Sequence, residues 1–202
     1  SILIVIYNLF VKHHGGVAAD AWDQPSVEAL TKGIPNLQRH VSNLQQGHGL
    51  PCVVAINHFV SDTTQEIDHV REQMAQQGVP VVVSRHWAEG SAGAVDLARA
   101  VVALVDSTKA QVRFIYDAQD SLWDKMKAIA TRVYGAIDIS ADAKVCASIE
   151  QLQQAGYGHY PVCVAKTQYS FSTDPKSLGA PTGHTVNIRE VRLAAGAEFV
   201  VM

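Results

Sequence analysis

Three groups of polar, basic and aromatic residues each follow directly behind a short apolar run. They are Asn57-His58-Phe59, Ser84-Arg85-His86-Trp87 and Lys166-Thr167-Gln168-Tyr169. Phe59 and Trp87 could hold a flat heterocycle between them, because stacked rings gain roughly 0.5–1.5 kcal/mol beyond plain area burial. Lys166 could bind a carboxylate or phosphate group. Asn57 and Tyr169 stand beside these residues, and we include them among the candidate substrate-binding residues.

Each of these candidates also has a structural explanation. An arbitrary pair of aromatic residues more often caps a core beneath a loop than binds a ligand. Lys166 could equally form a structural salt bridge. The residues alone therefore leave the aromatic pair and the lysine open between a ligand-binding and a structural role.

Other chemistries are disfavoured, and no catalytic residue is identified. The nine histidines include no HExxH motif, and His13 and His14 are adjacent, so they cannot share one helical face as a metal site would require. We therefore predict no dedicated metal site. Ser84 and His86 lack a nucleophile-elbow motif, which argues against serine hydrolase chemistry. Three acidic residues could suggest a hard-cation site, but carboxylates at the start of a helix also favour its positive end, and we prefer this second explanation. They are Asp117, Asp120 and Asp124.

The composition narrows the class of partner. The chain has 202 residues, of which 48% are hydrophobic and 17% charged, and its net charge is -3, so nothing indicates binding to nucleic acid or to an anionic membrane. No apolar run is long enough to span a bilayer. Cys52, Cys146 and Cys163 form no CxxC pair and predict reduced, buried thiols in a cytoplasmic protein. A small molecule or another protein is the expected partner.

Three proline-led apolar runs predict the strands that would position the candidate site. Residues 51–56, 80–83 and 161–165 each begin with proline and continue with β-branched or small apolar residues, as in strands buried on both faces of a parallel sheet. Ligands bind beyond the carboxyl ends of such strands. The three groups of candidate residues should therefore gather on one edge of the sheet.

Apolar stripes at helical spacing lie between these runs. Thr63 and Glu66 fit a capping box at the start of one helix. Another helix, beginning near Val27, is expected to be interrupted around Gly33 and Pro35. The four stripes are Val27-Leu30-Leu37-Val41-Leu44, Ile67-Val70-Met74, Ala94-Leu97-Val101-Leu104 and Leu122-Met126-Ile129-Val133.

The alternation of strands and helices predicts an α/β fold with a mostly parallel sheet flanked by helices. A long loop is expected over residues 170–185, followed by strands at 186–193 and 199–201. We place a boundary near residues 106–112, which gives one α/β lobe at 1–108 and a second, smaller α/β lobe at 109–202. No GxxxxGK[ST] or GxGxxG motif occurs, so these residues predict no phosphate-binding loop.

A set of short segments, in order along the whole chain, resembles the formyltetrahydrofolate synthetases (formate tetrahydrofolate ligases). The segments are Lys12-His-His-Gly-Gly16, Gly49-Leu-Pro-Cys-Val-Val-Ala-Ile-Asn-His-Phe59, Ser61-Asp-Thr63, His86-Trp-Ala-Glu-Gly90, Ile129-Ala130 with Tyr134-Gly135, Ala165-Lys-Thr-Gln-Tyr-Ser170, Gly179-Ala-Pro-Thr-Gly183 and Arg189-Glu-Val-Arg192. Each segment alone is a weak signal. Their shared order and spacing identify the chain as similar to the carboxyl-terminal half of this family.

The resemblance implies the ATP-dependent joining of formate to tetrahydrofolate through formyl phosphate, which gives 10-formyltetrahydrofolate, ADP and phosphate. It also implies that the positions matching Phe59 and Trp87 sandwich the pterin ring, so the ligand-binding role becomes the favoured one. Family members carry their P-loop upstream of the matching region, so this chain is expected to have a P-loop-NTPase-like topology without the P-loop. ATP and Mg would therefore bind through that missing region, and this chain alone should not make formyl phosphate.

Some positions depart from the family pattern. They are Leu9 for an arginine, His58 for an arginine, Val60 for a proline, Ser91 for a glycine, His184 for an aromatic residue and Glu198 for a glycine. Two hypotheses therefore stand together. The chain is a ligase part that binds folate, or it is a non-catalytic folate-binding or interaction module derived from the ligase. The second hypothesis predicts a P-loop-bearing partner chain or a homo-oligomer.

Overall fold

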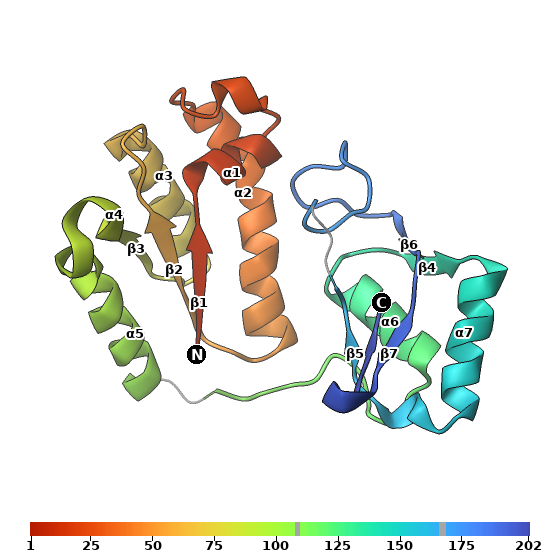
Figure 1. Cartoon of the computed structure of the whole chain (residues 1–202). Coiled ribbons are helices and arrows are strands. Elements are labelled where there is room, and N and C mark those ends of the chain that lie inside the picture. Colours follow the sequence, from red (N-terminus) through yellow and green to blue (C-terminus); the bar gives the residue numbers. More distant parts are fainter. Residues whose placement is uncertain (108–109, 166–168) are drawn as a thin grey trace. The chain divides into compact units, whose positions relative to one another are not determined.

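The computed structural model describes residues 1–107, 110–165 and 169–202. The chain divides into two compact units, Ser1–Arg113 and Phe114–Met202, which we call unit 1 and unit 2 (Figure 1). Each unit combines strands with covering helices, so the α/β prediction is confirmed at that level.

Unit 1 is built on a three-stranded parallel sheet. Its strands are β1 (Ile2–Ile6), β2 (Cys52–Asn57) and β3 (Val81–Ser84), in the order β1-β2-β3. All six residues of β2 are buried, as its continuous apolar run predicts for a central parallel strand. The first two proline-led runs are therefore neighbouring parallel strands.

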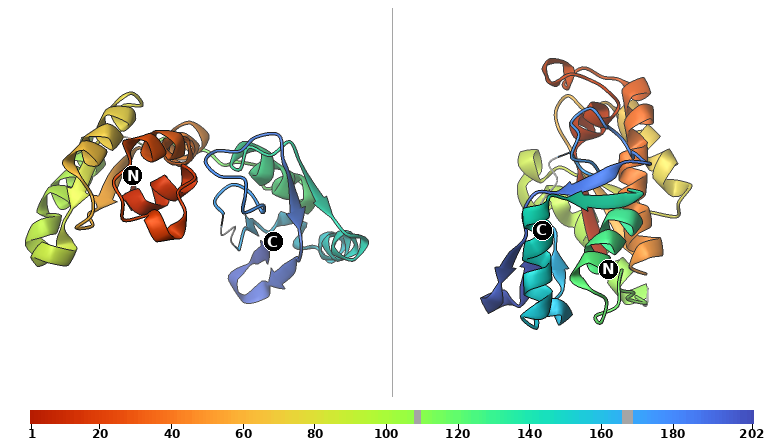
Figure 2. Two further views of the ribbon diagram at one scale, coloured as in Figure 1. Left: turned by 90° about the horizontal axis from the view of Figure 1, so that it is seen from above. Right: turned by 90° about the vertical axis from the view of Figure 1, so that its right-hand side faces the viewer.

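Helices cover both faces of this sheet. On one face lie α1 (Asn8–His14), α2 (Val27–Ser42) and α3 (Thr64–Ala75), whose apolar residues share one core with Cys52, Val54 and Ile56. On the other face lies α5 (Val95–Ser107), and the view from above in Figure 2 shows the sheet between these two layers. The shorter helical segments are η1 (Ala19–Ala21), η2 (Asn43–Gly47), α4 (His86–Glu89) and η3 (Gly90–Ala94).

The expected interruption of α2 is wrong, because the helix runs continuously through Gly33 and Pro35. Ile34 and Leu37 on either side of the proline are buried, and their packing holds the helix together despite the hydrogen bond that proline removes. Gly33 has a different function. A Cβ atom at this position would lie 1.8 Å from the carbonyl oxygen of Val11, so glycine is what allows α1 and α2 to approach closely.

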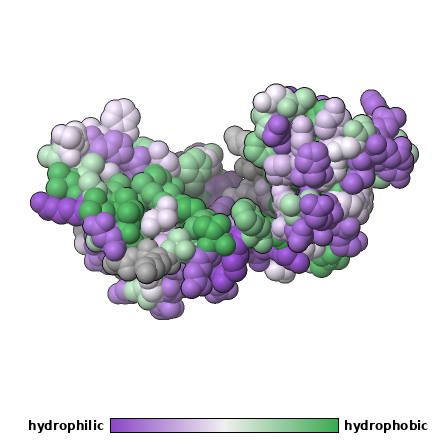
Figure 3. Space-filling view, turned by 90° about the horizontal axis from the view of Figure 1, so that it is seen from below, coloured by the Kyte–Doolittle hydropathy of each residue, from purple (hydrophilic) through white to green (hydrophobic). Residues whose placement is uncertain are grey.

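The second layer leaves part of the sheet uncovered. Leu3 and Val5 of β1 are 40% and 52% exposed, and Val102 and Val105 of α5 are both 58% exposed. We call these four residues the open apolar face of unit 1. Figure 3 shows apolar residues gathered on this unit when it is viewed from below. Such exposed apolar surface is a common mark of an interaction site.

Unit 2 contains two small sheets around α6 (Leu122–Arg132) and α7 (Ala143–Gln154). Strand β4 (Asp138–Ala141) pairs in parallel with β6 (Thr185–Ile188). In the other sheet, β8 (Phe199–Val201) lies between β5 (Val162–Cys163), which is parallel to it, and β7 (Arg192–Ala194), which is antiparallel. Two short segments, η4 (Tyr157–His159) and η5 (Ala195–Ala197), complete the unit.

Two of the strands expected in unit 2 differ from the structure. The strand expected at 186–193 is two strands, β6 and β7, which belong to different sheets. The third proline-led run forms a strand of two residues in which Cys163 is exposed, so it is not buried on both faces and its thiol is not buried either. β4 and α7 were not expected, although Val145, Ile149 and Leu152 of α7 follow helical spacing.

Candidate functional site

Three of the five candidate residues lie in unit 1, beyond the carboxyl ends of two neighbouring strands. Asn57 is the last residue of β2, Phe59 follows it two positions later, and Trp87 lies in α4 directly after β3. Since β2 and β3 are paired and parallel, both strands end at the same edge of the sheet. The predicted gathering at this edge is therefore observed for Asn57, Phe59 and Trp87.

The two aromatic side chains are available to a ligand. Phe59 is 37% exposed and Trp87 is 76% exposed. Phe59 is supported from one side by Tyr7, whose ring centroid lies 5.6 Å away at an interplanar angle of 60°. No ring contact joins Phe59 to Trp87 among the residues that the structure describes, so neither ring covers the other.

A tight turn fixes the position of Phe59. Its backbone N–H donates to Oδ2 of Asp62 at 2.9 Å, and the backbone N–H of Asp62 donates back to the carbonyl oxygen of Phe59 at 2.9 Å. Burial raises the pKa of the Asp62 carboxyl, although the hydrogen bond from Phe59 opposes this effect. The next residue, Thr63, caps α3, so the turn leads directly into a helix.

The capping box at the start of α3 is confirmed and extends into a buried ion pair. Thr63 and Glu66 exchange the two predicted hydrogen bonds. Glu66 Oε1 also accepts from the backbone N–H of Ser26 at 2.9 Å and lies 3.3 Å from Nζ of Lys12. Lys12 and Glu66 are 1% and 0% exposed. Burial alone would raise the pKa of Glu66, but the hydrogen bonds from Thr63 and Ser26 and the charge of Lys12 outweigh it, and its pKa lies below the ordinary value.

This pair explains the first of the family-like segments. Lys12 ties α1 to α3 through Glu66 and donates to the carbonyl oxygen of Gln24 at 2.9 Å. Gly15 lies against α2, since a Cβ atom there would be 1.9 Å from the carbonyl oxygen of Ala29. The segment therefore stabilises this edge of the sheet by holding α1 against α2 and α3.

Two buried asparagines at this edge carry unused hydrogen-bonding groups. Asn57 Oδ1 and both side-chain polar atoms of Asn8 have no partner among the residues that the structure describes. Asn8 is fully buried at the start of α1, directly after β1. Leaving such a group unpaired costs roughly 1–3 kcal/mol, which makes both residues candidates for contact with a polar ligand or an ordered water. Asn8 was missed by the sequence reasoning, although a single polar residue behind an apolar run is the signal that found Asn57.

The remaining two candidates belong to the second half of the chain. Tyr169 lies in unit 2, where it lines a cavity of about 550 Å³. Lys166 lies outside the described residues. No cluster of three or more metal-ligating side chains occurs within residues 1–107, 110–165 and 169–202. In the same ranges, no helix combines the length and apolarity needed to cross a membrane.

Comparison with known proteins gives one consistent match. Residues 2–202 match the family described as formate--tetrahydrofolate ligase. The ligase of Methylibium petroleiphilum is 54% identical over 205 residues, and that of Methylococcus capsulatus is 52% identical over 201 residues. Each alignment covers 100% of this chain but only 36% of the relative. The chain therefore spans little more than a third of the length of these curated relatives.

Proposed function

The chain belongs to the formate--tetrahydrofolate ligase family, and from this premise we propose that it contributes the tetrahydrofolate-binding residues of such a ligase. The complete enzyme would join formate to tetrahydrofolate with ATP, giving 10-formyltetrahydrofolate, ADP and phosphate. The observation that carries the proposal is the pair of exposed aromatic rings, Phe59 and Trp87, at the ends of neighbouring strands.

The residues around this pair suit a pterin ring, which is flat and carries hydrogen-bonding groups along its edges. Phe59 and Trp87 would stack on its faces. The unpaired Oδ1 of Asn57 could accept a hydrogen bond from the ring edge, which would relieve the cost of its burial. Lys166 and Tyr169 stay predicted substrate-binding residues.

We further propose that this chain is catalytically incomplete by itself. The relatives are nearly three times as long as the matched region, and no phosphate-binding motif occurs in the 202 residues. ATP and Mg would bind in the remaining part of the ligase, and this chain would have a P-loop-NTPase-like topology without the P-loop. A cytoplasmic location belongs to the same proposal.

A second candidate function rests on the open apolar face of unit 1. Leu3, Val5, Val102 and Val105 expose apolar surface that folding of this unit does not bury. A non-catalytic interaction module would use this face to bind a P-loop-bearing chain or a second copy of itself. This alternative predicts partner binding with little affinity for folate.

Calorimetric titration of the purified chain with tetrahydrofolate tests the first proposal. We expect saturable binding that is lost in Phe59→Ala and Trp87→Ala and kept in Phe114→Ala, a control at an aromatic residue that is 86% exposed. Binding that all three variants retain would place the folate elsewhere and reject the aromatic pair.

Absence of binding by the wild-type chain would favour the interaction module instead. Size-exclusion chromatography with light scattering then tests that alternative directly. A dimer that dissociates on Val102→Lys would support it, whereas a monomer at every concentration would reject self-association through this face.

A further inference from the structure

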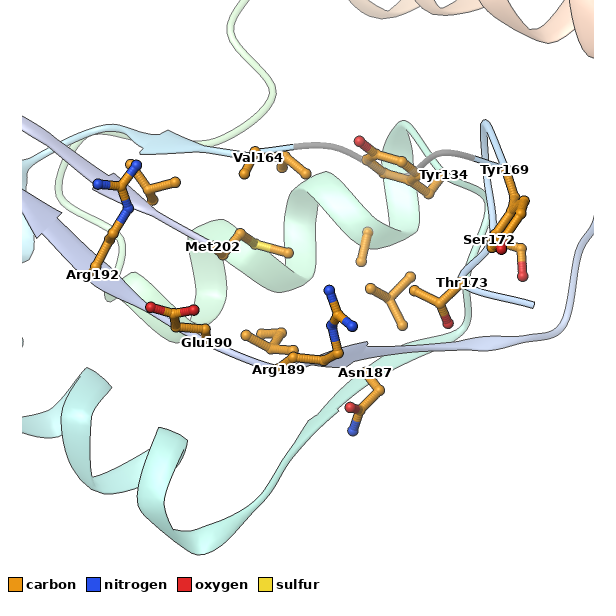
Figure 4. A pocket seen from close by; sticks show the side chains of 15 residues that line it. Tyr134, Val164, Tyr169, Ser172, Thr173, Asn187, Arg189, Glu190, Arg192 and Met202 are labelled. Carbon is orange, nitrogen blue, oxygen red and sulfur yellow. The ribbon is translucent and has the colours of Figure 1, made fainter. Parts of the chain in front are cut away.

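The cavity in unit 2 lies in a different unit from the Phe59–Trp87 pair. Its volume of about 550 Å³ falls within the range usual for small-molecule sites. The residues that line it divide into an apolar floor, a hydroxyl-bearing loop and a charged segment (Figure 4).

The floor is built from regular structure. Ala130 belongs to α6 and Ile188 to β6, while Met202 follows β8. Two backbone hydrogen bonds tie Met202 to the neighbouring segment at the end of β5: its N–H donates to the carbonyl oxygen of Cys163 at 2.9 Å, and its carbonyl accepts from the N–H of Ala165 at 2.8 Å. This surface could pack against an apolar ligand body.

The hydroxyl-bearing loop comprises residues 169–173, of which Tyr169, Ser172 and Thr173 line the cavity. Tyr169 and Ser172 form a β-bridge around Ser170, which adopts a left-handed backbone conformation (φ 64°) that residues other than glycine rarely take. Phe171 anchors the turn: it is only 2% exposed, and its ring lies 6.3 Å from that of Tyr134. Tyr134 and Tyr169 thereby lie at one end of the cavity (Figure 4).

The charged segment lies between β6 and β7. Arg189 extends from the end of β6 into the middle of the cavity, and Arg192 and Glu190 lie toward the end opposite the two tyrosines (Figure 4). Within the part of the chain that the structure describes, no acidic side chain forms an ion pair with either arginine. The three side chains together leave one net positive charge. A guanidinium group is planar and matches the geometry of a carboxylate or phosphate.

We propose that this cavity binds a small amphiphilic anion, with a carboxylate or phosphate group held by Arg189 and a flat apolar body resting on the floor formed by Ala130, Ile188 and Met202. The hydroxyl-bearing loop would supply further hydrogen bonds. The proposal does not depend on folate binding at Phe59 and Trp87.

Ligand-observed NMR on the full chain tests this site with three probes: benzoate, phenyl phosphate and the neutral benzamide. We expect saturable binding of at least one of the two anions and much weaker binding of benzamide. The preferred anion then identifies the head group as carboxylate or phosphate. Arg189→Gln should weaken anion binding roughly tenfold or more, because a charge-assisted pair is lost. Lys144→Gln on α7 removes the same charge outside the cavity and should leave binding unchanged.

Several results would overturn the proposal. They are failure of both anions to bind, equal binding of benzamide, and an equal loss in Arg189→Gln and Lys144→Gln. Glu190→Gln offers an independent check, because removing this negative charge should strengthen anion binding. If Arg189→Gln fails to fold, amide chemical-shift mapping on the wild-type chain decides the matter: shifts at Thr173, Asn187 and Met202 support the site, and shifts confined elsewhere refute it.

Discussion

The buried pair of Lys12 and Glu66 allows a sharp test of how unit 1 is held together. Glu66 is fully buried and is contacted by four hydrogen-bond donors or charges: the backbone N–H groups of Ser26 and Thr63, the hydroxyl of Thr63, and Nζ of Lys12. Glu66→Gln removes the negative charge. It also replaces one carboxylate oxygen, which accepts hydrogen bonds, by an amide N–H₂ group that faces hydrogen-bond donors. Lys12 would then be a buried cation without its partner.

The expected loss of unfolding free energy follows from that geometry. Breaking a buried ion pair by removing one partner costs about 3–5 kcal/mol, because the remaining charge stays desolvated. Glu28→Gln is the matched control: it removes the same charge from the Lys32–Glu28 pair, whose side chains are 62% and 80% exposed. Exposed pairs of this kind contribute little to stability, so we expect no measurable change.

Urea unfolding followed by tryptophan fluorescence measures the difference. A Trp123→Phe background removes the only tryptophan of unit 2, so the signal comes from Trp22 and Trp87 in unit 1. A Glu66→Gln variant no less stable than Glu28→Gln would refute the reasoning, because the pair would then make no net contribution.

The pKa of Glu66 gives the same pair a predicted pH dependence. The folded-state pKa lies below the ordinary value of 4.5, so folding favours the ionised carboxylate. Its contribution is therefore complete above the pKa of the unfolded chain and is lost as the pH falls through the folded-state pKa. The stability difference between the wild type and Glu66→Gln should narrow on acidification below about pH 4.5. A difference that widened there would contradict the sign.

Three further substitutions test separate features by urea unfolding. Gly33→Ala should destabilise unit 1 by about 1–3 kcal/mol or more, because its Cβ would meet the carbonyl oxygen of Val11 at 1.8 Å. Lys125→Met should cost about 1–3 kcal/mol in unit 2, because the buried ammonium donates to the carbonyl oxygens of Gly158 and Tyr160 at 2.6 and 3.1 Å. Glu198→Gly should stabilise unit 2 by about 0.5–1 kcal/mol, because Glu198 has a φ of 57°.

Matched controls make these three results interpretable. Gly196→Ala adds a methyl group where nothing lies within 4 Å, so it should change little. Lys144→Met removes an exposed lysine from α7 and should be neutral. Glu190→Gly, at a position without a positive φ, should not stabilise. If a control variant changed the unfolding free energy as much as the variant it is paired with, the close contact, the buried hydrogen bonds or the positive φ would not be the cause.

The sequence predicts unit 1 well because its signals are local and agree with one another. The apolar run behind Pro51 forms a buried strand, and the capping box of Thr63 and Glu66 is observed. Asn57, Phe59 and Trp87 lie at the ends of paired strands as expected, while their binding role stays a prediction. Pro35 predicts an interruption of α2 that the buried packing of Ile34 and Leu37 overcomes. The close contact that Gly33 permits with α1 is a tertiary feature, which no local pattern contains.

Unit 2 was harder to predict because its elements are short and its strands only half-buried. A continuous β-like pattern across residues 186–193 conceals a change of sheet between Ile188 and Arg192. The resemblance to the family points to one feature of unit 2 that no local pattern indicates. Glu198 departs from the glycine that the family resemblance implies at this position, and its left-handed backbone conformation is one that glycine adopts more readily.

The open apolar face of unit 1 has a practical consequence for anyone producing this chain. Four aliphatic side chains in water are the kind of surface that heat-shock chaperones hold and that drives loss of material during concentration. Yield in the soluble fraction should therefore depend on what else is expressed in the same cell. Co-production with the remaining ligase sequence, or a lysine at Val102, is the first change to make when preparing samples for titration or crystallisation.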